Sequence, residues 1–188
     1  GGVANTVTGV AVNGPAKTVT LTLTTPVGFA EVVTVAYTDP TAGNDANAIQ
    51  DAAGNDAASL GVTPVTNNTP DTTAPVLATA TINGNTLVLS YTEATTLDAV
   101  NIPAVGAFAV VAGGVANPVT AVTVNAAAKT VTLTLASAVA AGQVVTVAYT
   151  DPTAGNDASA VQDAAGNDAA TLAATAVTNN TAPPPPPP

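Results

Sequence analysis

The chain has 188 residues, of which 47% are apolar and only 7% are charged, and its formal net charge is −10. Its only cations, Lys17 and Lys129, cannot form the basic stripe that nucleic-acid or anionic-lipid binding requires. The sequence has no His and no Cys, the side chains most often used as general bases and nucleophiles, so we do not expect an enzyme. No apolar run approaches the roughly 20 residues of a membrane-spanning helix, and we expect no membrane insertion.

An internal repeat defines the domain organisation. Residues 1–69 align without gaps on residues 113–181, and 51 of the 69 positions are identical. The sequence therefore predicts one complete unit at 70–181, preceded by the C-terminal part of another at 1–69, which lacks a counterpart of 70–112. The tail at 182–188 ends in six prolines, which predict a polyproline II rod.

Apolar residues alternate with Thr along both units, for example in Val145-Thr-Val-Ala-Tyr149. This period of two is typical of a strand with one buried face. Seven short strands in one unit of about 110 residues predict an immunoglobulin-like sandwich. The predicted fold class is all-β, with tandem immunoglobulin-like β-sandwich repeats of which the first is incomplete. The strands are expected at about 7–12, 17–24, 31–38 and 61–67 in the partial unit, and at about 76–82, 86–92, 106–111, 119–124, 130–135, 145–149 and 173–179 in the complete one.

Several motifs add a family resemblance: Asp71-Thr-Thr-Ala-Pro75, the Asn83-Gly84 turn, the strand Val145–Tyr149 followed by Asp151, and Asp163-Ala-Ala-Gly-Asn167. With these motifs the complete unit resembles the SwmB-type bacterial immunoglobulin-like repeat. The resemblance implies tandem repeats of large secreted surface proteins, including adhesins, and hence an extracellular location. It also implies that the repeat acts as a stiff extender. In related repeats calcium often lies at or near the domain junctions.

The loop after each Tyr-containing strand concentrates carboxylates without nearby cations. Such groups repel one another, and calcium would relieve the repulsion, since it takes 6–8 oxygen ligands from carboxylates, amides and backbone carbonyls. The loops therefore hold the candidate calcium ligands. They are Asp39, Asn44, Asp45, Asp51, Asn55 and Asp56 in the first copy, and Asp151, Asn156, Asp157, Asp163, Asn167 and Asp168 in the second.

An alternative without a metal explains the same residues. Asp and Asn side chains accept hydrogen bonds from nearby backbone N–H groups, so they stabilise turns and begin helices. In this interpretation Asn44 or Asp45 begins a short helix at 46–50. The sequence leaves both interpretations open.

The two lysines suggest a cross-link. Lys17 could form an isopeptide bond with Asn67, and Lys129 one with Asn179, as in domains of surface fibres. The simpler alternative is that each Lys is a solvated charge at a strand edge.

The incomplete first unit predicts an exposed apolar face and unpaired strand edges. We expect neighbouring repeats or identical subunits as partners, the latter in a head-to-tail filament that completes the partial unit. The alternative function is a calcium-dependent adhesive module that binds a glycan or another surface.

Overall fold

The computed structural model describes residues 2–185, and the chain divides into unit 1, Gly1–Asp71, and unit 2, Thr72–Pro188. The last three prolines of the expected polyproline rod lie outside the described residues. Among the described residues, none belongs to a helix long and apolar enough to cross a membrane. The predicted all-β class is confirmed in both units.

Unit 2 is one curled sheet with the strand order β8-β7-β11-β12-β5-β6-β10-β9. Its two halves meet where β12 runs parallel to β5, with Thr178 opposite Thr81 and Asn179 opposite Ile82. All other strand pairs are antiparallel. The strands are β5 (Val76–Asn83), β6 (Thr86–Thr92), β7 (Phe108–Ala112), β8 (Val115–Ala116), β9 (Val119–Asn125), β10 (Thr130–Leu135), β11 (Val145–Tyr149) and β12 (Leu172–Asn179), and a 3-10 turn, η1 (Val105–Ala107), precedes β7.

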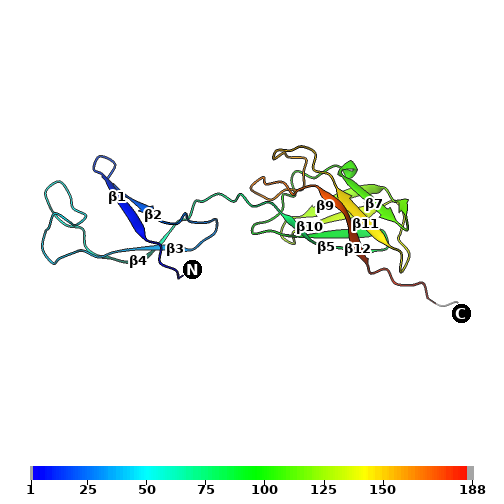
Figure 1. Cartoon of the computed structure of the whole chain (residues 1–188), viewed down its shortest axis with the longest axis horizontal. Coiled ribbons are helices and arrows are strands. Elements are labelled where there is room, and N and C mark those ends of the chain that lie inside the picture. The colour runs from blue at the N-terminus through cyan, green and yellow to red at the C-terminus, as the bar shows by residue number, and fades with distance from the viewer. Residues whose placement is uncertain (1, 186–188) are drawn as a thin grey trace. The chain divides into compact units, whose positions relative to one another are not determined.

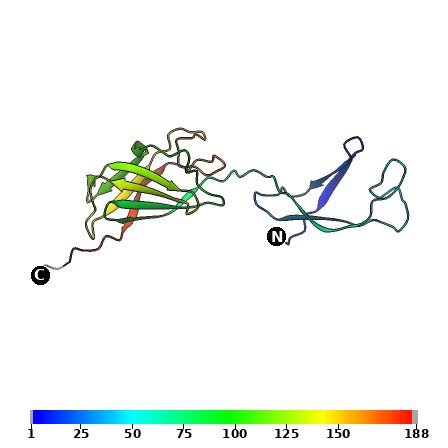
Figure 2. The same ribbon diagram turned by 180° about the vertical axis from the view of Figure 1, so that it is seen from behind.

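The core of unit 2 lies between these two halves. Figures 1 and 2 view the unit from opposite sides, with β11 and β12 toward the viewer in the first and the β5, β6, β9 and β10 half in the second. Apolar residues from both halves form one cluster, which gives the unit a sandwich-like architecture. The alternation along β10 shows the cause: Val131, Leu133 and Leu135 are at most 1% exposed, and the intervening Thr residues are half-buried.

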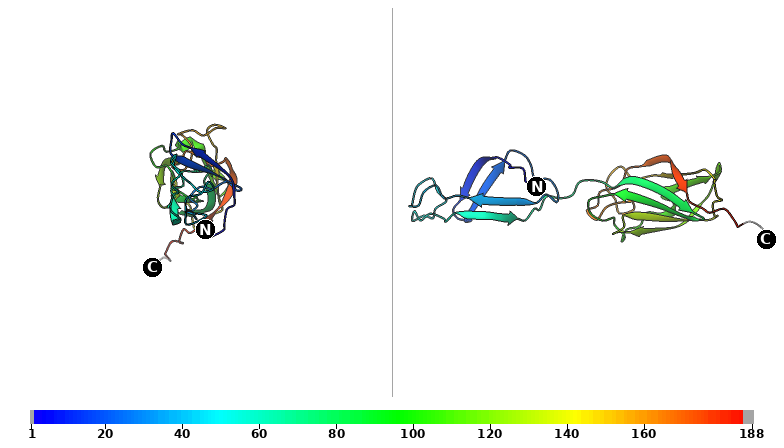
Figure 3. Two further views of the ribbon diagram at one scale, coloured as in Figure 1. Left: turned by 90° about the vertical axis from the view of Figure 1, so that its left-hand side faces the viewer. Right: turned by 90° about the horizontal axis from the view of Figure 1, so that it is seen from below.

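Unit 1 consists of two separate hairpins (Figure 3). They are β1 (Val7–Asn13) with β2 (Thr18–Leu23), and β3 (Val33–Tyr37) with β4 (Leu60–Val65). By the repeat offset these strands correspond to β9, β10, β11 and β12, so the strands that join the two hairpins in unit 2 have no counterpart here. Consequently Leu21 is 38% exposed, whereas its counterpart Leu133 is 0% exposed.

The expected strands are all found, with boundaries within about two residues of prediction. Sequence reasoning missed the short β8 and η1. The expected helix at 46–50 is wrong: these residues form turns and one isolated bridge, Gln50 with Asp56. The Asp45 carboxylate accepts the N–H of Asn47, two residues on, which closes a turn instead of beginning a helix.

Candidate cation sites in the acidic loops

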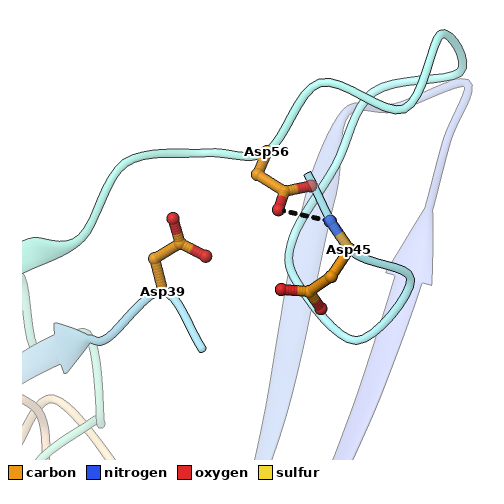
Figure 4. Close-up of side chains that lie close together, drawn as sticks. All are labelled: Asp39, Asp45 and Asp56. Carbon is orange, nitrogen blue, oxygen red and sulfur yellow. Dashed lines mark hydrogen bonds between the residues drawn. The ribbon is translucent and has the colours of Figure 1, made fainter. Parts of the chain in front are cut away.

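In unit 1 the β3–β4 loop brings three carboxylates together. Asp39 lies two residues after β3, and the loop then turns back so that Asp45 and Asp56 lie beside it (Figure 4). One carboxylate oxygen from each residue lies within 4.8 Å of the other two. This spacing fits three oxygens around a single cation bound at 2.3–2.6 Å.

Hydrogen bonds fix the shape of this loop. The Asp45 N–H donates to Asp56 Oδ2 at 2.8 Å, and the Thr41 hydroxyl donates to Asp45 Oδ2 at 2.9 Å. Asn44 accepts the N–H of Asp56 through Oδ1 at 3.4 Å. The Asn44 oxygen is therefore directed at the loop backbone, beside the carboxylates.

Unit 2 repeats this arrangement in its β11–β12 loop with Asp151, Asp157 and Asp168, again within 4.8 Å. The Asp157 N–H donates to Asp168 Oδ2 at 2.7 Å, and the Thr153 hydroxyl donates to Asp157 Oδ2 at 2.8 Å. Asn156 accepts the N–H of Asp168 at 3.4 Å. The two loops thus share one geometry. We call Asp39, Asp45 and Asp56, and Asp151, Asp157 and Asp168, the two loop clusters.

Both loop clusters contain buried oxygens without a hydrogen bond to any described residue. These atoms are Oδ1 of Asp39, Asp56, Asp151 and Asp168. A buried, unpaired carboxylate oxygen costs free energy unless it is neutralised or bonded. Burial, with the neighbouring charges of Asp157 and Asp151, raises the pKa of Asp168. The loop clusters therefore have both the oxygens and the unfavourable charge that a cation would correct.

The remaining candidates close turns. In unit 1 the Asp51 carboxylate accepts the N–H groups of Ala53 and Asn55 and the side-chain amide of Asn55. The side-chain hydrogen bond from Asn55 is the main cause of the lowered pKa of Asp51. Asp163 and Asn167 make the same bonds in unit 2. The turn bonds that the capping interpretation expects are therefore present at these four residues.

A tyrosine ties each loop to the sheet. The Tyr149 hydroxyl accepts the N–H of Val161 at 2.9 Å, and the Tyr37 hydroxyl accepts that of Ile49 at 3.0 Å. Tyr149 is 1% exposed and packs against Phe108 with ring centroids 5.2 Å apart. In each unit the hydrogen bond to the tyrosine hydroxyl anchors the loop segment between the second and third carboxylates of the cluster.

The structure does not bring the expected cross-link partners together. The Lys129 ammonium donates to the backbone carbonyl of Glu93. Asn179 donates its side-chain amide to the carbonyls of Ala140 and Gln143. Lys129 is half-buried in the β9–β10 turn, and its ammonium is bonded to a backbone carbonyl, which differs from the fully solvated edge charge of the alternative.

In unit 1, Asn67 likewise donates to backbone carbonyls, those of Gly28 and Glu31. Lys17 is exposed in the β1–β2 turn. Lys17 is therefore solvated, as the simpler interpretation expects, but it lies in a turn and not at a strand edge.

The fold and the loop clusters define a class of protein: an all-β repeat protein with a carboxylate-rich loop in each unit. The chain belongs to the family described as "Putative flagellar system-associated repeat", which matches residues 1–42 and 70–154. The two matches reproduce the internal repeat, because 1–42 corresponds by the offset to 113–154.

Two solved structures are similar to part of the chain. The N-terminal part of the bacterial S-layer protein SbsC is 18% identical, with a TM-score of 0.45, over 57% of this chain and 24% of that chain. The S-layer protein rSbsC(31-844) is 17% identical, with a TM-score of 0.43, over 56% of this chain and 14% of that chain. The chain thus spans at most about a quarter of these proteins. No curated protein matches it.

Proposed function

We propose that the chain is a structural repeat of an extracellular bacterial surface protein, and that each loop cluster binds one calcium ion. The bound ion fixes the acidic loop at the end of each unit, and the repeat serves as a stiff extender. Membership of a repeat family and the absence of His and Cys support a structural role. Calcium sites of extracellular modules bind at about 10⁻⁴ to 10⁻³ M, so such loops fill outside the cell.

The observation that carries the proposal is the duplicated geometry of the loop clusters. In both units three carboxylate oxygens lie within 4.8 Å, and two of the three residues have a buried oxygen without a hydrogen bond. A turn that needed only capping would leave no such oxygens, as Asp51 illustrates with its bonds to Ala53 and Asn55. Oxygen-only ligands favour calcium over zinc or copper.

Calcium titration tests the loop clusters. We expect millimolar calcium to raise the melting temperature of the full chain by several degrees, because it binds the folded state only. The variant Asp56→Asn with Asp168→Asn keeps an oxygen acceptor for the loop N–H groups but removes one charge per cluster. We expect it to lose two calcium ions per chain, measured by calorimetry and native mass spectrometry.

Asp51→Asn is the matched control, since it removes one carboxylate of the same loop outside the cluster. It should retain calcium binding in full. A melting temperature that neither calcium nor a chelator changes would reject calcium binding by the loops.

We further propose that the partner of unit 1 is a segment with the sequence of 70–112, supplied by a neighbouring repeat. In unit 2 this segment contributes β6, which pairs with β10, and β5, which pairs with β12. The strand that receives β6 is identical in both units, Thr-Val-Thr-Leu-Thr-Leu in β2 and β10. A second intact copy already uses its own 70–112 internally, which favours a neighbouring repeat over a filament of identical subunits.

An extended chain tests this partner. Adding a second copy of 70–112 before residue 1 should protect the amides of β2 and β4 from hydrogen exchange, because the added strands complete both hairpins. Size-exclusion chromatography of the original chain serves as the companion measurement, and we expect discrete monomers. Polymers that grow with concentration would favour the filament, and unchanged exchange in the extended chain would refute completion by this segment.

A further inference from the structure

Two further carboxylates meet inside unit 2, away from the atoms of its loop cluster. Glu93 directly follows β6, and Asp163 lies in the β11–β12 loop. The backbone brings them together, because Leu97 forms a bridge with Asp163 and the Ala164 N–H donates to Thr96 O at 2.9 Å. A carboxylate oxygen of Glu93 lies within 4.8 Å of one of Asp163.

Both side chains are removed from water. Asp163 is 1% exposed and Glu93 is 9% exposed. The Glu93 Oε1 atom accepts the N–H and the hydroxyl of Thr95, at 2.8 and 3.2 Å. The Glu93 Oε2 atom is buried and has no hydrogen-bond partner among residues 2–185.

No cation of the described chain neutralises this pair. The only Lys of unit 2, Lys129, donates to the backbone carbonyl of Glu93 and forms no ion pair with either carboxylate. Removing an ionised carboxylate from water costs free energy unless another charge or a full set of hydrogen bonds compensates. Asp163 has such a set, because it accepts the N–H groups of Ala165 and Asn167 and the side-chain amide of Asn167. In Glu93 only Oε1 accepts hydrogen bonds.

We propose that a hard divalent cation of the calcium class binds between Glu93 and Asp163. The orphaned Glu93 oxygen supplies one ligand and Asp163 a second, and the ion joins the segment after β6 to the β11–β12 loop. Both carboxylates offer only oxygen atoms as ligands, which suits calcium and disfavours soft metals. This inner site is independent of the loop clusters, since it shares no carboxylate with them.

Unit 1 provides an internal comparison. Asp51 is the counterpart of Asp163 and makes the same turn bonds with its own Asn, but it is exposed. Unit 1 has no counterpart of Glu93, because that residue belongs to 70–112. The turn therefore forms without a second carboxylate, and the Glu93–Asp163 pair needs a different explanation from turn formation.

The test uses the full chain with Asp56→Asn and Asp168→Asn, so that the loop clusters are disabled. We expect this background to bind one calcium ion by native mass spectrometry, and calcium to raise the melting temperature of unit 2. Adding Glu93→Gln, which keeps the size and the acceptor for Thr95, should abolish that ion. Adding Asp51→Asn instead should leave it bound.

Asp163→Asn provides a second route to the same result, and circular dichroism verifies that each variant is folded. A background that binds no calcium, or a Glu93→Gln variant that still binds one ion, overturns the inner site. If the background binds no calcium and Glu93→Gln alone stabilises the calcium-free chain, the pair holds a shared proton instead. Because the loop-cluster variants are tested separately, failure here leaves the proposal for the loops standing.

Discussion

Leu133→Ala is expected to destabilise unit 2 by about 2–5 kcal/mol, whereas the matched change Leu21→Ala in unit 1 should cost less than about 1 kcal/mol. Leu133 is fully buried on β10, between the two halves of the sheet, and its removal leaves a cavity. Leu21 occupies the same position of an identical strand but is 38% exposed. The expected fall in the melting temperature of unit 2 is on the order of 10 °C or more.

Scanning calorimetry of the full chain measures both variants. Val10→Ala is a further control, because Val10 is 64% exposed on β1. Equal losses for Leu133→Ala and Leu21→Ala would contradict the assignment of unit 1 as an open half. The same Leu21→Ala change should become costly in the chain extended by a second copy of 70–112, because completion buries that side chain.

The strands could be predicted from the sequence because their signal is local. In β10 each Thr alternates with Val or Leu, and each apolar side chain is buried as the alternation requires. The joining of the two halves through β12 and β5 was not predictable, since it rests on two parallel residue pairs whose members are 97 positions apart in the sequence. The short β8 has only two residues and carries no pattern.

The acidic loops show a second limit of prediction from the sequence. Sequence alone leaves Asp45 and Asp51 equivalent, since both are carboxylates followed closely by Asn. The structure separates them, because Asp51 bonds to its own turn while Asp45 joins Asp39 and Asp56. Which oxygens remain unpaired depends on how the loop folds back, and spacing does not encode that.

Glu93 was missed for a related reason. It lies 70 positions before Asp163, and only the packing of the segment after β6 against the β11–β12 loop brings the two together. The one available signal was an acidic residue at the end of a buried strand in a chain with few charges. A carboxylate in such a position needs a partner, and the sequence has few cations to offer.

Raising the pH above about 10 is expected to destabilise unit 2 progressively. Burial raises the pKa of Tyr149 to about 12, and burial also raises the pKa of Tyr91. Tyrosine in an unfolded chain ionises near pH 10. The stability due to the neutral rings is therefore complete below that pH, and it is lost as the pH rises toward the higher values of the folded state.

The double variant Tyr91→Phe with Tyr149→Phe separates this effect from the loss of a hydrogen bond. At neutral pH it should be less stable by about 1–3 kcal/mol, because the Val161 N–H loses its buried acceptor. Its stability should nevertheless fall less steeply with rising pH, since no tyrosine of unit 2 remains to ionise. Urea unfolding at several pH values gives both quantities, and Tyr37→Phe in unit 1 should leave the slope for unit 2 unchanged. An equal slope in the double variant would show that groups other than the buried tyrosines control alkaline unfolding.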